Sequence, residues 1–146
     1  MYIYWIAMTL LIVAGGIFSQ MQHNDETVSE QATIDALSRN MLVYRSAAAE
    51  YARANPGFTG APSEVSMNLP NWYSKLDGIS TYVAGGVSYT YITGGVPAGL
   101  PSALTDRTES VTVGVKRFGQ LFSPKGGNMG IAVPEQVPEG SVVAVY

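Results

Sequence analysis

The feature that most constrains this chain is an uncharged apolar run at its start, residues 2–18. As an α-helix rising about 1.5 Å per residue, the run would be roughly 25 Å long, close to the thickness of a thin bilayer core. Tyr2, Tyr4 and Trp5 stand at its N-terminal end, and amphipathic aromatic side chains favour the boundary between membrane and water. The run predicts a transmembrane anchor over residues 1–19, a polar connector over residues 20–26 and an exported domain over residues 27–146.

Two other interpretations of this run stay open. The small residues at 14–16 suit signal-peptidase cleavage before Ile17, although the basic segment of a usual secretory signal is missing. A buried core helix would usually be shorter or carry a polar stripe. We favour a retained anchor. Because the first cation after the run is Arg39, we expect a single-pass inner-membrane protein with its C-terminal domain in the periplasm.

Composition narrows the functions that the exported domain could have. The net charge of −3, with no cluster of Lys and Arg, argues against a nucleic-acid surface. The absence of cysteine excludes disulfides and thiolate metal sites. Sixteen glycines, eight prolines and nine tyrosines indicate a turn-rich domain that contains β-structure.

A second helix is predicted over residues 27–54. The sequence TVSE at residues 27–30 matches a capping box, and the Asn-Pro-Gly at residues 55–57 should end the helix. One face is apolar at three- and four-residue spacing: Ile34, Leu37, Met41, Tyr44, Ala48 and Tyr51 or Ala52. We expect this amphipathic helix to pack across a mainly antiparallel sheet, although its Ala-rich stripe also suits packing against partner helices.

From residue 79 the apolar pattern changes to period two. Strands at residues 79–83 and 87–92 flank a Gly-Gly pair, which is typical of a β-hairpin. Further along, the pattern predicts two helical turns at residues 100–107, strands at 110–116, 119–123, 131–133 and 141–146, and a turn at 123–128. The predicted fold class is therefore α+β, with an N-terminal membrane helix.

Few residues suggest catalysis. His23, the one histidine, lies in the connector and is interpreted as a solvated surface residue, because a triad or a multi-histidine metal site cannot be built around it. Ser123 and Lys125 superficially resemble a catalytic dyad but lie in a turn. We predict no catalytic, cofactor-binding or metal-binding residue and expect a protein that is not an enzyme.

The remaining conspicuous residues also have plain structural interpretations. Asp106, Arg107 and Glu109 are interpreted as an exposed, self-compensating charge cluster. The Gly-Gly pairs at 85, 94 and 126 lack the strand–loop–helix context of a phosphate cradle. Trp72 and Tyr73 are expected to pack in the core or at a sheet edge instead of forming a binding platform. By elimination, function should lie in protein surfaces.

Three short motifs carry a resemblance to a known family. They are MLVYR at residues 41–45, YARANPG at residues 51–57 and LPNWY at residues 69–73. They resemble the PilM family of small membrane proteins encoded with plasmid thin (type IV) pili. The resemblance implies a component needed to build thin pili that serve conjugation, with other pilus-assembly proteins or pilins and the lipid bilayer as partners. It supplies no catalytic residues.

The order of elements also resembles a pilin, which has an apolar N-terminal helix, an amphipathic continuation and antiparallel strands. A prepilin is cut after a Gly that precedes the apolar run, and a Glu usually follows in the mature chain. In this sequence the Gly pair at residues 15–16 lies near the far end of the run, and the run contains no Glu. A minor pilin-like subunit therefore stays as one alternative, and a secreted envelope hydrolase with a cleaved signal as another.

Overall fold

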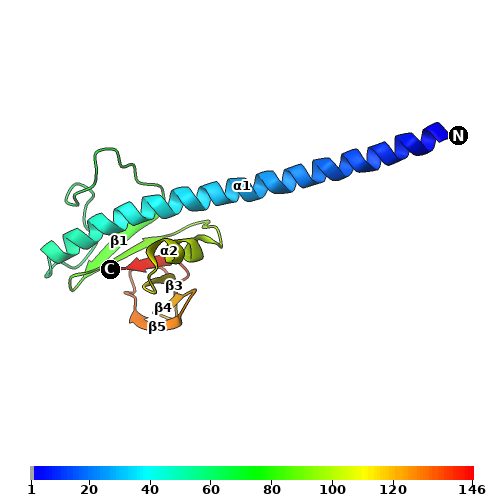
Figure 1. The fold of residues 1–146 in the computed structure, drawn as a ribbon. Coiled ribbons are helices and arrows are strands. Elements are labelled where there is room, and N and C mark those ends of the chain that lie inside the picture. Colours follow the sequence, from blue (N-terminus) through cyan, green and yellow to red (C-terminus); the bar gives the residue numbers. More distant parts are fainter. Residues whose placement is uncertain (1) are drawn as a thin grey trace. The chain divides into compact units, whose positions relative to one another are not determined.

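The computed structural model describes the backbone of residues 2–146 and the side chains of residues 2–15 and 27–146. Over that range the order of elements is α1, β1, β2, α2, β3, β4, β5 and β6 (Figure 1). The chain divides into two compact units, Met1–Thr33 and Ile34–Tyr146. All strands and α2 lie in the second unit, and the fold class is α+β.

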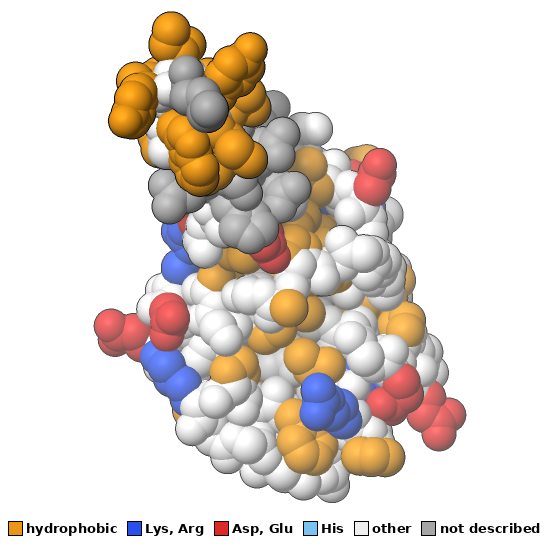
Figure 2. Space-filling view, turned by 90° about the vertical axis from the view of Figure 1, so that its right-hand side faces the viewer, with side chains coloured by type: hydrophobic (Ala, Val, Ile, Leu, Met, Phe, Trp, Pro, Cys, Tyr) orange, Lys and Arg blue, Asp and Glu red, His pale blue; other side chains and the backbone are white. Residues whose placement is uncertain are grey.

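Helix α1 runs from Tyr2 to Ala54 and is 53 residues long. Figure 2 shows apolar side chains around its N-terminal end. The exposed large apolar residues there are Tyr2, Ile3, Tyr4, Trp5, Ile6, Met8, Leu10, Leu11, Ile12 and Val13. Within the residues whose side chains are described, no helix carries an apolar segment long enough to cross a membrane, which does not support the predicted membrane span.

The predicted helix start at residue 27 is wrong. The backbone of α1 is helical from Tyr2 onward, so it is already helical through residues 20–30. A capping box begins a helix only where the N-cap backbone is non-helical, and residues 20–26 contain no Gly or Pro that would break the helix. The predicted end near Ala54 is confirmed. His23 lies among residues 16–26, outside the described side chains.

The strands form a single six-stranded sheet of order β1-β2-β6-β3-β4-β5, with antiparallel pairs throughout. The bounds are β1 Ile79–Ala84, β2 Val87–Ile92, β3 Val113–Arg117, β4 Gln120–Ser123, β5 Gly127–Ala132 and β6 Val142–Val145. The last strand of the chain is thus inserted between the β1–β2 hairpin and the three strands β3, β4 and β5. This non-local placement depends on tertiary packing.

The predicted hairpin is confirmed. Ala84 pairs with Val87, and Gly85 and Gly86 have φ angles of 59° and 79°. Both lie in the left-handed region that a type I′ turn requires and that glycine adopts without strain. Residues 131 and 132 of the strand predicted at 131–133 form the end of β5, which begins inside the expected turn at Gly127, and Val133 lies just beyond it.

The two faces of the sheet are covered differently. The second unit's part of α1 and the short helix α2, Leu100–Thr108, pack on one face. Their core contains Ile34, Met41, Tyr44, Ala47, Ala48, Met67, Ile79, Ile92, Leu100, Leu104, Val113, Val142 and Ala144. On the other face, Val133 and Val137 of the β5–β6 connection pack against Leu121, Val143 and Val145. All four β6 residues are therefore buried. The predicted packing of the amphipathic helix on its own sheet is confirmed.

Candidate functional site

The connection between α1 and β1, residues 55–78, is the longest irregular segment of the domain. It contains no strand and joins the sheet through an isolated β-bridge. Gly60 makes that bridge with Val83, on the outer side of β1. Met67 is buried in the core. Irregular connections of this length in a compact domain are uncommon and often functional. This segment is therefore the first place to look for a site.

Asn40 of α1 fastens this segment to the helix. Its Nδ2 donates to the Ser74 carbonyl at 2.7 Å, and its Oδ1 accepts from the Tyr73 hydroxyl at 2.7 Å and from the Leu76 amide at 3.3 Å. One side chain thus satisfies three groups within four residues of the connection. Asparagine has low helix propensity because its amide competes for nearby backbone groups. Here the amide instead bonds groups that are distant in sequence.

Aromatic contacts reinforce this attachment. The Tyr73 ring stacks on Tyr44 of α1, with centroids 6.1 Å apart and planes inclined by 24°. Lys75 forms an ion pair with Glu64 at 2.5 Å, and its ammonium lies 5.8 Å from the Tyr44 centroid. Burial raises the pKa of the Tyr73 hydroxyl, with smaller contributions from Tyr44 and Glu64. Residues 73–75 are therefore held against α1 by several independent contacts.

Trp72 directly precedes residues 73–75, which are held against α1, and its side chain is 75% exposed. Its ring meets Tyr73 edge-to-face, with centroids 6.5 Å apart. The prediction that both aromatics pack in the core or at a sheet edge is confirmed for half-buried Tyr73 and wrong for Trp72. The physical reason is that Asn40 and Tyr44 take up the Tyr73 side chain, which leaves its neighbour facing solvent.

A hollow of about 680 Å³ lies between Trp72 and α1, and we name it the Trp72 groove. Its helix side is lined by Ala36, Arg39, Asn40, Leu42 and Val43, and its other side by Trp72, Tyr73 and Ser74. The helix residues recur every three or four positions, so they share one face, and the small Ala36 leaves room for close approach. This geometry suits an apolar helix laid along α1 beside an aromatic wall.

The residues considered for catalysis do not come together. The Ser123 side chain is buried, and its Oγ has no hydrogen-bond partner among the described residues. Lys125 instead forms an ion pair with Asp106 at 3.0 Å. Among the described residues no base is hydrogen-bonded to Ser123 Oγ to accept its proton, as nucleophilic catalysis would need.

The interpretation of Asp106, Arg107 and Glu109 as a self-compensating cluster is wrong. Arg107 pairs with Asp35 of α1, and Asp106 pairs with Lys125. The fold brings α2 close to these partners, which are distant in sequence. Asp35 also lies 4.0 Å from Arg39, which follows it by four residues on α1.

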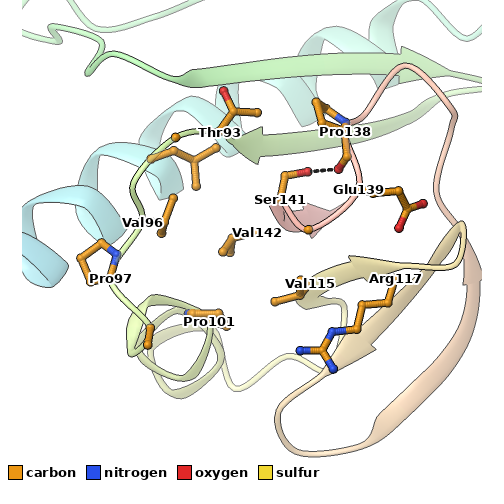
Figure 3. Close-up of a pocket in the computed structure, with 14 residues that line it drawn as sticks. Thr93, Val96, Pro97, Pro101, Val115, Arg117, Pro138, Glu139, Ser141 and Val142 are labelled. Carbon is orange, nitrogen blue, oxygen red and sulfur yellow. Dashed lines mark hydrogen bonds between the residues drawn. The ribbon is translucent and has the colours of Figure 1, made fainter.

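A second hollow, of about 590 Å³, opens where β6 begins (Figure 3). Apolar side chains such as Val96, Pro101 and Val115 line most of it. Ser141 Oγ donates to the Pro138 carbonyl at 2.5 Å. Glu139 accepts a hydrogen bond from the Gly119 amide at 2.9 Å, so these two side chains have structural partners, and Thr93 and Arg117 also line the hollow.

The sequence contained a partial signal for the Trp72 groove. The motif at residues 69–73 was conspicuous for its aromatics, but nothing local showed which ring would be exposed. Asn40 carried a weaker hint, since a mid-helix asparagine needs a hydrogen-bond partner when part-buried. Its partners are 33 to 36 residues away in sequence, so only the fold identifies them.

The fold and this site define a small α+β domain built on the C-terminal part of a long helix, with an exposed aromatic groove on that helix. The PilM family model matches residues 8–145 of this sequence. A PilM crystal structure from Pseudomonas aeruginosa 2192 is 45% identical, with a TM-score of 0.50, and covers 77% of this chain and 92% of that one. No curated protein matches the sequence significantly.

The chain belongs to the PilM family. A second PilM structure, from Escherichia coli B7A, shares the fold with a TM-score of 0.60 at 18% identity, over 80% of this chain and 93% of that one. The resemblance stated from three motifs is thereby confirmed over nearly the whole length. Membership of this family indicates a part in pilus biogenesis.

Proposed function

We propose that this protein is a non-enzymatic, membrane-anchored component needed for assembly of a thin type IV pilus used in conjugation. Its domain would bind an apolar helix of another pilus-assembly protein or pilin in the Trp72 groove. The observation that carries the proposal is Trp72 itself, a large aromatic that is 75% exposed on a segment fixed by neighbouring contacts. Such rigid aromatic anchors dominate many protein interfaces.

The N-terminal part of α1 supports the anchoring part of the proposal. Ten large apolar side chains between Tyr2 and Val13 are exposed, far more than scattered surface residues would supply. Lipid contact would remove these side chains from water. The test is to fractionate cells and to measure the molecular mass of the protein in each fraction by mass spectrometry. An intact N-terminus in the inner-membrane fraction supports anchoring, whereas a soluble form beginning at Ile17 contradicts it.

The groove is tested by photo-crosslinking from position 72 in cells that carry the full pilus operon. A matched pair of variants separates binding from folding. Val65 is 98% exposed on the same connection but does not line the groove, so Val65→Ala is the control for Trp72→Ala. We expect Trp72→Ala to reduce piliation and liquid conjugation at unchanged protein level, and Val65→Ala to leave both unchanged. Equal piliation in the two strains would contradict the proposal.

A minor pilin-like subunit is the alternative, favoured by the unbroken α1. One helix carries an exposed apolar part at its start and packs on an antiparallel sheet near its end, which is the arrangement expected of a pilin. Purified pili distinguish the two functions. A subunit would be found in the fibre, whereas an assembly component would stay with the cell envelope.

A further inference from the structure

A small cavity of about 200 Å³ lies between α1 and the end of the chain, and it shares no lining residue with the Trp72 groove. Arg45, Glu50 and Arg53 of α1 supply its charges, and the Tyr146 ring forms one wall. Each guanidinium carbon lies 4.6 Å from the Tyr146 ring centroid, so two cations contact one ring. Stacking on an aromatic face positions a guanidinium without neutralising its charge.

Arg45 is the unusual member of this group. It is only 9% exposed, and its Nε is buried with no hydrogen-bond partner among the described atoms. One terminal nitrogen makes a long bond of 3.4 Å to the Val145 carbonyl. Burial lowers the pKa of Arg45, as expected when a cation is desolvated without an opposite charge. Buried cations are normally paired, because leaving one unpaired is costly.

No carboxylate of the described residues forms an ion pair with Arg45 or Arg53. Arg53 alone has a structural explanation, since it lies in the last turn of α1, where a positive charge complements the helix dipole. That explanation does not extend to Arg45, which is interior to the helix. The hydrogen bond and charge of Arg53, more than the charge of Arg45, lower the pKa of the Tyr146 hydroxyl, as expected for a phenol beside two cations.

We propose that this cavity binds a carboxylate, held between the guanidinium groups of Arg45 and Arg53 beside the Tyr146 ring. The charges select the ligand class. Among the lining side chains, two guanidinium groups stand against the single carboxylate of Glu50, so the cavity favours a small anion. The planar fork of arginine also matches the two oxygens of a carboxylate. A phosphate dianion would be repelled by Glu50 more strongly than a singly charged carboxylate would.

The carboxylate can come from an acidic side chain of a partner polypeptide or from a small free acid. Acetate is the simplest probe, titrated into the full chain against chloride at equal ionic strength. The readout is the Arg side-chain Nε–Hε signals and the Tyr146 ring signals in NMR spectra. We expect saturable shifts with acetate alone. Identical responses to acetate and chloride, or tighter binding of phosphate than of acetate, would overturn the proposal.

Variants at the cavity test the assignment without unfolding the protein. Arg53→Gln should weaken acetate binding about tenfold, the equivalent of one lost charge-assisted hydrogen bond. Glu50→Gln should tighten it, an effect that a purely structural role for the arginines would not produce. Arg39→Gln is the matched control, because Arg39 is an exposed arginine of the same helix outside the cavity. An Arg53→Gln affinity equal to that of Arg39→Gln would refute the site.

Two capped tripeptides identify the source of the carboxylate. One carries a central Asp and the other a central Asn, so they differ only in the charged group. Tighter binding of the Asp peptide than of acetate supports a partner polypeptide, and equal binding supports a small free acid. Binding of the Asn peptide as tight as that of the Asp peptide would contradict recognition of a carboxylate.

Discussion

Replacing Lys116 by Met should loosen the β5–β6 connection, which covers the face of the sheet opposite α1 and α2. Lys116 is 3% exposed on β3, and its ammonium donates to the Pro134 carbonyl at 2.9 Å and to the Val137 carbonyl at 2.8 Å. Glu139 lies 3.5 Å away. These bonds hold the β5–β6 connection, whose Val137 packs with Leu121, Val143 and Val145. Methionine keeps most of the aliphatic stem and removes the donor, so packing changes little.

The size of the effect follows from these contacts. Two hydrogen bonds from a charged donor contribute roughly 3–6 kcal/mol together. Removing the ammonium also ends its desolvation cost, which offsets part of that sum. We therefore expect Lys116→Met to lower the free energy of unfolding by about 2–3 kcal/mol. Urea denaturation of the full chain, followed by far-UV circular dichroism, measures this free energy.

An exposed lysine supplies the control. Lys125 is 53% exposed and pairs with Asp106 at 3.0 Å, so Lys125→Met should cost less than about 1 kcal/mol. Glu139→Gln separates the ion pair from the carbonyl bonds and should also cost about 1 kcal/mol or less. If Lys116→Met were no more destabilising than Lys125→Met, the reasoning that the ammonium holds this connection would be refuted.

Two further predictions concern the other face and the packing between strands. A Cβ at Gly114 would overlap the Phe122 carbonyl oxygen of the paired strand β4. Gly114→Ala should therefore lower the free energy of unfolding by at least about 2 kcal/mol in the same urea assay. An unchanged free energy would contradict the close approach of the two strands. The raised pKa of Tyr73 means that its contribution to stability is complete below about pH 10, the unfolded value, and declines as the pH rises beyond it. Tyr73→Phe should flatten this alkaline decline, measured by urea midpoints between about pH 8 and 11, and an unchanged slope would show that the hydroxyl is not buried as described.

The sequence determined the local elements of this protein because their signals are local. The three- and four-residue spacing of Ile34, Met41, Tyr44 and Ala48 identified the helical face that packs on the sheet. Gly85 and Gly86 marked the hairpin turn, since few other residues adopt the required backbone angles. The motifs at residues 41–73 were specific enough to identify the family.

Tertiary structure alone decided the position of β6 between β2 and β3, the exposure of Trp72 and the pairing of Asp106 with Lys125. Each depends on groups far apart in sequence, whose approach is set by burial of the whole core and not by local backbone preference. Asn40 illustrates the difference: its residue type hinted at a hydrogen bond, but its partners lie across the connection that the folded domain brings back to the helix. The surfaces that we assign to binding arise in the same way, because Arg45 and Tyr146 meet only after β6 has taken its place in the sheet.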